Sequence, residues 1–209
     1  MGVVVLRCRT VLTLLAGAAI LSVSGCYTPI QRGVDERQLI DSGAYRLITD
    51  LSVPPVRGAE GCGAQGLATV IAFFEPTTDP AGLADELPWH DVGASPVDLL
   101  LEVRRRGFGA AVARGSWEAL VDHLEEREPV LVMFDAGVEV RMLAMRIPST
   151  KVMHWGVVSG MALDGSELLL AARDHRHYVV DRTDFLRRWS KSDNCMIVIR
   201  RAIRSGTPK

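Results

Sequence analysis

The sequence predicts an α+β fold in which helices come first along the chain and pack on an antiparallel sheet that follows. Helical patterns lie between residues 62 and 126, whereas short apolar runs typical of strands dominate from residue 129 onward. The dipeptide Asp164-Gly165 separates two of these runs, which is a strong signal for a β-hairpin. The chain has 209 residues, 48% of them hydrophobic, so one sizeable core and a single domain are expected.

Net charge and cysteine content exclude several classes of protein. The chain carries 24 basic and 25 acidic side chains, so it lacks the broad basic surface of a nucleic-acid-binding protein. Its four cysteines show no Cys-x-x-Cys spacing and are too few for a disulfide-rich miniprotein. We therefore expect no nucleic-acid partner, no cofactor and no metal, and we interpret each cysteine from its own surroundings.

The first 25 residues differ from the rest of the chain. Arg7 and Arg9 precede an uncharged run, Thr10–Ser24. This run is too short for a membrane span of about 20 residues, and the order is typical of a secretory signal peptide. The tetrapeptide Val23-Ser24-Gly25-Cys26 resembles the bacterial lipobox, which implies cleavage before Cys26 and a lipid on its sulfur. A plain secretory signal or an N-terminal anchor helix is the alternative.

The lipobox resemblance also implies a location. It predicts a lipoprotein of the bacterial cell envelope that contacts the membrane through Cys26. Tyr27 stands where an aspartate would indicate retention in the inner membrane, so the outer membrane, facing the periplasm, is favoured. We divide the chain into a signal peptide (1–25), a tether and lead-in segment (26–52), a main domain (53–203) and a C-terminal tail (204–209).

Cys62 is expected at the N-terminus of the first long helix. Before it, the lead-in segment contains a possible short helix around residues 35–46, and Pro54 and Pro55 then force an extended conformation. A loop by composition separates these prolines from Cys62. Apolar residues recur after Cys62 at the spacing of one helix face: Leu67, Val70, Ile71 and Phe74.

The remaining elements follow in order along the chain. Proline at the start and glycine after the end predict a helix over Pro96–Arg106, and Ser116 is a candidate N-cap for a helix that ends at Glu126. The stretch 136–152 has no clear periodicity and is interpreted as a loop. We expect strands at Phe108–Ala113, Pro129–Asp135, Trp155–Leu163, Glu167–Ala172, Tyr178–Val180 and Met196–Arg200, with a helical turn at Asp184–Trp189.

One pair of residues could carry chemistry: Cys62 opens a helix, and His154 opens a strand. The thiolate is the reactive form of cysteine, and a helix N-terminus favours it. A histidine can accept the thiol proton, and the N–H groups of the helix can bind the oxyanion that forms on an attacked carbonyl. The alternative is structural, because Cys62 lies between two glycines at a tight helix entry and His154 can be a half-buried histidine.

The surroundings of this pair resemble a known family. Glu60–Val70 and His154–Gly160 are similar to the cysteine and histidine motifs of the double-glycine (bacteriocin-leader) peptidases, a papain-like group. Phe185–Trp189 resembles the helix that closes the domain in stand-alone lipoprotein members. The resemblance implies a papain-like cysteine peptidase fold over the main domain, with Cys62 as the nucleophile and His154 as the general base.

Two departures from the family put activity in doubt, and the first concerns the oxyanion hole. Papain-like sites use a glutamine about five residues before the cysteine, and this chain has Arg57 there. Arginine can donate N–H bonds, but its longer side chain need not reach the same point. A weakened oxyanion hole costs about 3 kcal/mol, or some hundredfold in rate.

The second departure concerns the residue that orients the histidine. Family members carry an Asp or Asn where this chain has Ala172, and the nearest acid is Asp174. A two-residue loop at Asp164-Gly165 turns Asp174 away from the face of His154. A three-residue loop instead puts Asp174 opposite Gly156, on that face. We expect the three-residue loop; if it does not form, the site is a Cys-His dyad.

Other candidate residues have weaker support. His175 and His177 alternate on an expected surface strand, so we interpret them as solvated polar residues and not as metal ligands. His90 and His123 lack partners in the sequence. Cys195 is expected to be a buried strand residue.

Three functions stay open at this point. The first is a membrane-anchored cysteine peptidase that acts on a peptide or protein substrate. The second is a binding module that keeps the peptidase fold without full activity, as Arg57 and Ala172 suggest. The third is a structural lipoprotein with a Cys62–Cys195 disulfide, which would remove the nucleophile. The sequence contains no transporter segment, so any leader removal coupled to export needs a separate export machinery.

Overall fold

The computed structural model describes residues 32–55, 61–89, 93–137, 139–142, 145–148 and 152–201. The predicted lipidation site Cys26 and the predicted oxyanion donor Arg57 lie outside these residues. The chain divides into two compact units. The larger unit comprises Ile30–Ala136 and Val152–Lys209. The smaller comprises Met1–Pro29 and Gly137–Lys151. Within the described residues, no helix is long and apolar enough to cross a membrane.

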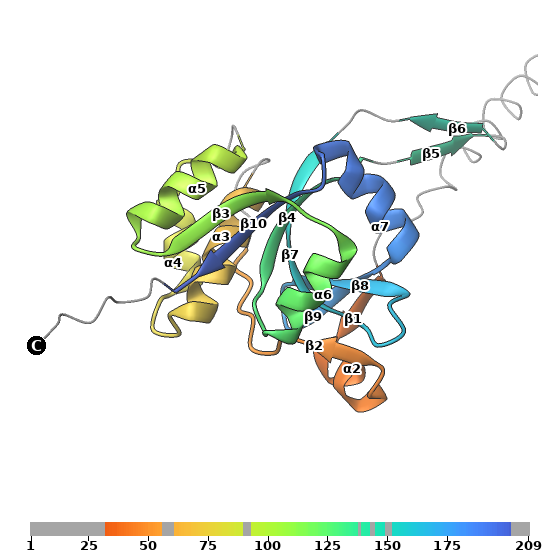
Figure 1. Ribbon diagram of the computed structural model, residues 1–209, viewed down its shortest axis with the longest axis horizontal. Helices are drawn as coiled ribbons and strands as arrows, with labels where there is room; N and C mark the ends of the chain where they lie inside the picture. Colours follow the sequence, from red (N-terminus) through yellow and green to blue (C-terminus); the bar gives the residue numbers. More distant parts are fainter. Residues whose placement is uncertain are drawn as a thin grey trace, which may run out of the picture. The chain divides into compact units, whose positions relative to one another are not determined.

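The larger unit is built on one eight-stranded sheet (Figure 1). The strands lie in the order β1-β9-β8-β7-β4-β10-β3, β2 pairs with β7, and every pairing is antiparallel. Their bounds are β1 Arg32–Asp35, β2 Tyr45–Leu47, β3 Gly109–Arg114, β4 Val130–Asp135, β7 Met153–Ala162, β8 Glu167–Ala172, β9 Arg176–Asp181 and β10 Cys195–Arg200.

Six α-helices accompany the sheet, and four of them precede most of its strands, which agrees with the predicted α+β order. They are α2 Glu36–Ser42, α3 Cys62–Phe74, α4 Pro80–Glu86, α5 Pro96–Arg105, α6 Trp117–Glu125 and α7 Arg182–Trp189. A short 3-10 helix, η1, follows at Ser190–Ser192. The helices predicted at Cys62, Pro96 and Ser116 are confirmed, and the Ser116 side chain accepts the Ala119 N–H as expected of an N-cap.

Part of the segment expected to be a tether belongs to the sheet. β1 pairs with β9 and β2 pairs with β7, so packed structure is already present at Arg32, well before Val53. The helix expected over 35–46 is shorter, because the Asp35 side chain caps it and Gly43 ends it with a φ of 61°. Strands of three and four residues are too short to show a period in the sequence.

Two other expectations need correction. The stretch 136–152, interpreted as a loop, contains a two-stranded sheet of β5 (Glu139–Met142) and β6 (Met145–Pro148). This hairpin falls in the smaller unit. The sequence analysis also missed α4, which begins at Pro80 with Asp79 as its N-cap and has seven residues, two of them buried hydrophobics.

The core lies on both faces of the central strands β4 and β7. α3 packs on one face, where a Cβ added to Gly66 would lie 2.6 Å from the Leu131 side chain. α7 packs on the other face, where the Phe185 and Phe134 rings lie 6.4 Å apart. In Figure 1, α3 to α5 accordingly lie on one side of β4 and β7 and α7 on the other. Neighbouring residues of β7 therefore contact different helices.

Gly160 of β7 lies very close to the backbone of β2. A Cβ at this position would overlap the Arg46 carbonyl oxygen and lie 3.2 Å from the Leu47 Cα. Both of these residues belong to β2. Backbone atoms cannot move aside as a flexible side chain can. Only glycine therefore lets β2 pair with β7 here.

We predict that Gly160→Ala lowers the free energy of unfolding by about 1–3 kcal/mol, the usual cost of overpacking. Gly109→Ala is the matched control, because its added Cβ would meet only the Arg200 carbonyl at 3.7 Å, an ordinary contact. Urea unfolding of both variants measures the difference. If the two variants were equally stable, the close approach of the β2 backbone to Gly160 would be contradicted.

Candidate active site

The N-terminus of α3 is open in a way that no other described α-helix shares. Its first helical hydrogen bond runs from the Gln65 N–H to the Gly61 carbonyl at 3.0 Å, so the N–H groups of Cys62, Gly63 and Ala64 have no acceptor within the helix. Gly61 has no side chain to cap them. The other five helices all begin with an Asp or Ser whose side chain accepts a backbone N–H.

The sulfur of Cys62 lies at the edge of β7. Its Sγ accepts the backbone N–H of Trp155 at 3.5 Å. The Ala136 N–H donates to the Val152 carbonyl at 2.8 Å, which continues the β4–β7 register, so the N–H of Trp155 points away from β4. β8 pairs with β7 only from Val158 onward. β8 therefore does not pair with β7 beside Trp155. The Cys62 sulfur lies there instead and accepts the Trp155 N–H.

His154 immediately precedes the residue that binds the sulfur. It pairs with Phe134 across β4 and β7, and the two rings meet edge to face with centroids 5.6 Å apart. The imidazole is half-buried. The structure thus brings Cys62 and His154, 92 positions apart in the sequence, to the same end of β7. A backbone N–H beside the sulfur stabilises a thiolate there.

Trp155 also fixes the loop before α5 against the start of α3. Its indole Nε1 donates to the Ala94 carbonyl at 2.8 Å. A Cβ added to Gly63 would lie 2.6 Å from the Ala94 Cβ and 3.3 Å from the indole. Only glycine fits at position 63 while this contact holds. The sequence analysis did not predict this role of Trp155. The only signal in the sequence was that Trp155 directly follows His154.

Gln65 fixes the segment that leads into the site. Its side-chain amide donates to the Pro54 carbonyl at 2.6 Å, one turn into α3. This agrees with the interpretation that Gln65 is not the oxyanion-hole glutamine of papain-like sites. The bond holds the backbone shortly before Arg57, the residue that stands in that glutamine's place.

The hairpin between β7 and β8 differs from the expectation. Met161 pairs with Leu168, which is the register of the two-residue loop, so the expected three-residue loop is wrong. The turn is held by the Asp164 carboxylate, which accepts the Ser166 N–H at 2.9 Å and its hydroxyl at 2.6 Å. A further shift occurs at Ser159, which is the extra residue of a β-bulge in β7.

The register argument for Asp174 therefore fails. β8 pairs with β9 and no longer with β7 after Leu170. Asp174 and His175 form the turn between β8 and β9, both with positive φ, 58° and 52°. The Asp174 side chain is exposed and forms no hydrogen bond or ion pair within the part of the chain that is described. The geometry gives no support to Asp174 as the group that orients His154.

The two described cysteines do not form a disulfide. Neither Cys62 nor Cys195 is bonded in a disulfide, so the bridge weighed in the sequence analysis is not formed. Burial raises the pKa of the Cys195 thiol, which keeps it protonated and unreactive at neutral pH. Cys195 lies in β10 as expected, but its side chain is only partly buried and not fully buried as predicted.

His177 is buried and not on a solvated surface, which corrects the sequence interpretation. Its Nδ1 lies 2.8 Å from the Ser159 hydroxyl, and its Nε2 lies 3.2 Å from the Glu36 carboxylate. A serine, a histidine and a carboxylate in this order can form a hydrolase triad. Ser159, however, has no exposed surface and also contacts the Leu169 carbonyl at 3.2 Å. The group is a structural link between the bulge in β7 and the start of α2.

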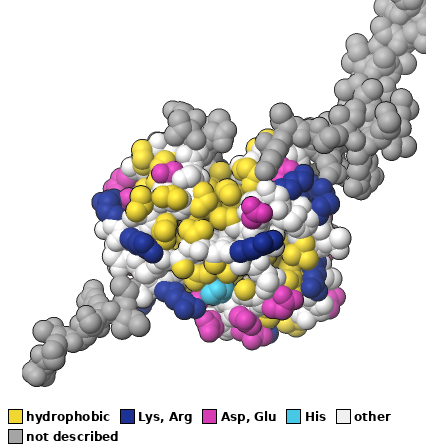
Figure 2. Space-filling model, turned by 45° about the horizontal axis from the view of Figure 1, so that its top comes forward, with side chains coloured by type: hydrophobic (Ala, Val, Ile, Leu, Met, Phe, Trp, Pro, Cys, Tyr) yellow, Lys and Arg dark blue, Asp and Glu magenta, His cyan; other side chains and the backbone are white. Residues whose placement is uncertain are grey.

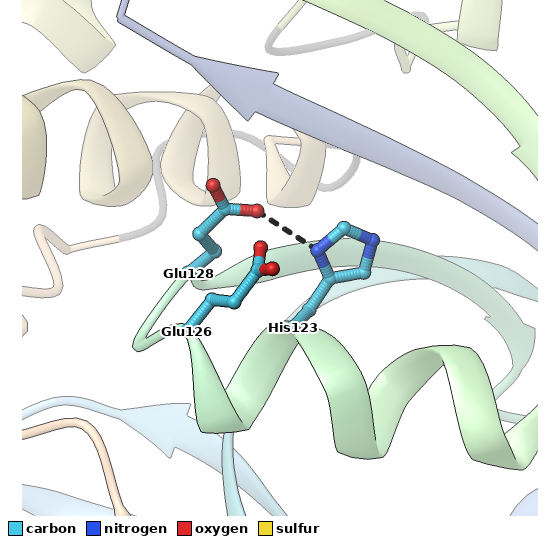
Figure 3. A group of neighbouring side chains, drawn as sticks. All are labelled: His123, Glu126 and Glu128. Carbon is cyan, nitrogen blue, oxygen red and sulfur yellow. Dashed lines mark hydrogen bonds and ion pairs between the residues drawn. The ribbon is translucent and has the colours of Figure 1, made fainter.

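A second polar cluster lies at the end of α6, drawn in Figure 3. His123 Nδ1 lies 2.9 Å from the Glu128 carboxylate, and ligand atoms of His123, Glu126 and Glu128 all lie within 4.8 Å of one another. The Arg200 guanidinium already contacts Glu126 at 3.5 Å and Glu128 at 3.2 Å. A metal ion would have to displace this cation. We interpret the cluster as an ion-pair network that holds the end of β10.

Comparison with known proteins agrees with this architecture. Neither a family model nor a curated protein matches the chain. The peptidase domain of Streptococcus ComA, a bi-functional ABC transporter involved in a quorum-sensing pathway, is similar in structure. It aligns with a TM-score of 0.51 and 15% identity over 73% of this chain and 99% of that domain. A C39-like peptidase from Bacillus anthracis aligns with a TM-score of 0.51 and 16% identity, over 73% and 96%.

These likenesses establish the fold and not the chemistry, because the identities are low. The chain has the papain-like α+β fold of C39 peptidase domains, with helices packed on an antiparallel sheet. This confirms the predicted fold class. The alignments cover 99% and 96% of the two neighbours, so the likeness in fold extends over nearly their whole length.

The His177 link predicts a pH dependence of stability. Burial lowers the pKa of His177, against the opposite effects of the hydrogen bond and charge of Glu36. The unfolded chain, with the ordinary histidine pKa of about 6.5, then binds more protons than the folded chain just below that pH. Stability is therefore present above pH ~6.5 and is lost as the pH falls from there toward the lowered pKa.

We expect His177→Gln to reduce this slope, measured as the free energy of urea unfolding between pH 5 and 7.5. The matched control is His175→Gln, because His175 is exposed in the neighbouring turn. Because the charge of His175 is the smallest of the causes that shift the pKa of His177, this variant should change the slope less than His177→Gln does. Equal slopes for His177→Gln and the wild type would show that His177 does not titrate with folding.

Proposed function

We propose that this protein is a cysteine peptidase that hydrolyses a peptide or amide bond through a thioester on Cys62, with His154 as the general base. The observation that supports it most is the position of the Cys62 sulfur. It lies at the N-terminus of α3, which has no side-chain cap, and accepts the N–H of Trp155, the residue that follows His154 in β7. The fold of C39 peptidase domains supports the same reaction class.

The proposed reaction has two stages. The thiol proton passes to the His154 imidazole as the sulfur attacks the substrate carbonyl carbon, and the uncapped N–H groups at the start of α3 bind the oxyanion. The imidazolium then protonates the leaving amine, and the C–N bond breaks to give the thioester. His154 next takes a proton from water, the resulting hydroxide attacks the thioester, and the acid product and free thiol are released.

We propose that Cys62 and His154 are the reacting pair of the site. Asp174 stays a candidate through its sequence position alone, since its turn is exposed and Ala172 occupies the family's usual place. Phe134 packs against the imidazole and can hold its orientation in place of a carboxylate. Arg57 is proposed to assist the oxyanion hole, as its position before Cys62 suggests.

The location and partners follow from the N-terminal sequence. We propose that Cys26 carries a lipid and anchors the protein in the bacterial envelope, at the outer membrane and facing the periplasm. The substrate is a peptide or protein. We also propose that any processing coupled to export involves a separate export machinery. Only the five residues 27–31 separate Cys26 from β1, so the domain would stay close to the bilayer.

Two observations support a second candidate function, that of a binding module. Arg57 replaces the expected oxyanion glutamine, and Asp174 makes no described contact that could orient His154. Both fit a peptidase-fold binding module on the envelope that has lost most of its catalytic rate. Such a module would need the shape of the site but not its thiol.

Thiol alkylation tests the proposed nucleophile directly. We expect iodoacetamide to modify Cys62 at neutral pH at least tenfold faster than a model thiol, because the helix N-terminus and the Trp155 N–H stabilise the thiolate. His154→Ala should remove this advantage. Asp174→Asn should leave the rate unchanged if the site is a dyad.

Cys195 is the internal control for this experiment, because its raised pKa predicts slow alkylation. Mass spectrometry of the two cysteine-containing peptides separates the rates. A Cys62 that reacts no faster than a model thiol, or whose rate does not depend on His154, would contradict the proposed pair.

Hydrolysis itself is tested in cells. A Cys62→Ala strain should lose a set of peptide N-termini that the wild-type strain produces, as measured by proteome-wide N-terminal labelling. Cys195→Ser is the matched control and should keep them. If the Cys62→Ala strain produces the same N-termini and the same phenotype as the wild type, the binding module is the better description.

A further inference from the structure

The outer edge of β3 has no neighbouring strand. β3 ends the strand order of the sheet, and its six residues pair with β10 in a continuous register. The Gly115 N–H donates to the Asn194 carbonyl at 2.9 Å, which continues that register by one pair. Hydrogen-bonded residues alternate along an antiparallel pair. Ala110, Val112 and Arg114 therefore direct their backbone groups away from β10.

Most of these outward groups have no partner. The Ala110 carbonyl accepts a bond from the Arg104 guanidinium at 3.3 Å. The Ala110 N–H and both backbone groups of Val112 and Arg114 have no hydrogen-bond partner among the residues that the structure describes. An edge of this kind is a ready template for another strand.

β3 also lacks the devices by which proteins usually protect an edge. Its sequence, Gly-Ala-Ala-Val-Ala-Arg, contains no proline, its register has no bulge, and no charged side chain lies in its middle. Four of its six residues are exposed, and Val112 is 41% exposed. Figure 2 shows further apolar side chains on the side of the domain that carries α5 and β3. The apolar residues of α5 with large exposure are Val97 and Leu101.

The arginines at the two ends of β3 favour an acidic partner strand. Arg104 contacts one end of the strand, and Arg114 forms the other end. Neither forms an ion pair with a described residue, whereas the neighbouring Arg105, Arg106 and Arg200 all do. An incoming strand with carboxylates would neutralise both ends.

The same charges disfavour pairing with a second copy of this chain. A two-fold antiparallel pair centred on Val112 would place Arg114 beside Ala110 of the other copy, where Arg104 is bound. A pair centred on Arg114 would bring two arginines directly opposite each other. Like charges across a strand pair are destabilising. The edge is thus suited to a foreign acidic strand.

We propose that the outer edge of β3 binds an extended, acidic segment of a partner protein by strand addition. Main-chain hydrogen bonds to Val112 and its neighbours provide the contact, and the arginines at both ends provide the charge preference. The site is separate from Cys62, and it does not depend on the proposed peptidase activity.

The test uses the full chain and two fluorescein-labelled ten-residue peptides, one alternating threonine with glutamate and the other alternating threonine with lysine. Fluorescence anisotropy at low salt measures their Kd. Val112→Pro removes the outward N–H without removing a bond to β10, and proline is tolerated at such an edge position. Val112→Ala, the matched control, keeps this N–H.

We expect the glutamate peptide to bind the wild type and Val112→Ala equally, and to bind Val112→Pro at least tenfold more weakly. The combined variant Arg104→Gln, Arg114→Gln should also bind at least tenfold more weakly, and it decides the question if Val112→Pro does not fold. The alkylation rate of Cys62 should be unchanged in every variant that folds. The proposal is overturned if no saturable binding occurs, if the lysine peptide binds equally well, or if a folded Val112→Pro binds like the wild type.

Discussion

The bond from the Trp155 N–H to the Cys62 sulfur is the interaction on which the rest of the site depends. It can form only because β8 stops pairing with β7 at Val158 and leaves the edge of β7 open where α3 arrives. Had β8 continued along β7, its own carbonyls would have taken this N–H. The bulge at Ser159 lies at that point, and its hydroxyl and His177 hold it from the β9 side.

Close packing around α3 keeps the helix at that edge. Gly63 lets Ala94 and the Trp155 indole lie against the first turn, and Gly66 admits Leu131 from β4. A side chain at either position would push the helix outward, and a shift of about 1 Å is enough to misplace reacting atoms. These two glycines are therefore a geometric requirement of the site, although glycine lowers the intrinsic helix propensity.

The helix at Cys62 and the strand at His154 could be predicted because both signals are local: an apolar stripe of period 3.6 and an apolar run. The strands β1 and β2 could not, since three or four residues show no period. The register of β8 against β7 near His154 could not be predicted either. It depends on the bulge at Ser159, which a buried contact with His177 stabilises. Asp174 was chosen from the register of a three-residue loop, and the hairpin instead has the register of a two-residue loop, with its turn held by Asp164.

The glycine before Cys62 has a consequence for comparing related chains. Glycine at an N-cap costs a helix only a few tenths of a kcal/mol relative to serine, so the open first turn of α3 is compatible with a stable fold. A Ser, Thr, Asp or Asn at position 61 would keep the fold but supply an oxygen that accepts the N–H groups of the first turn, which α3 now leaves without a side-chain cap. The residue at position 61 therefore decides whether the first N–H groups of α3 are capped by a side chain, with little effect on the stability of the helix.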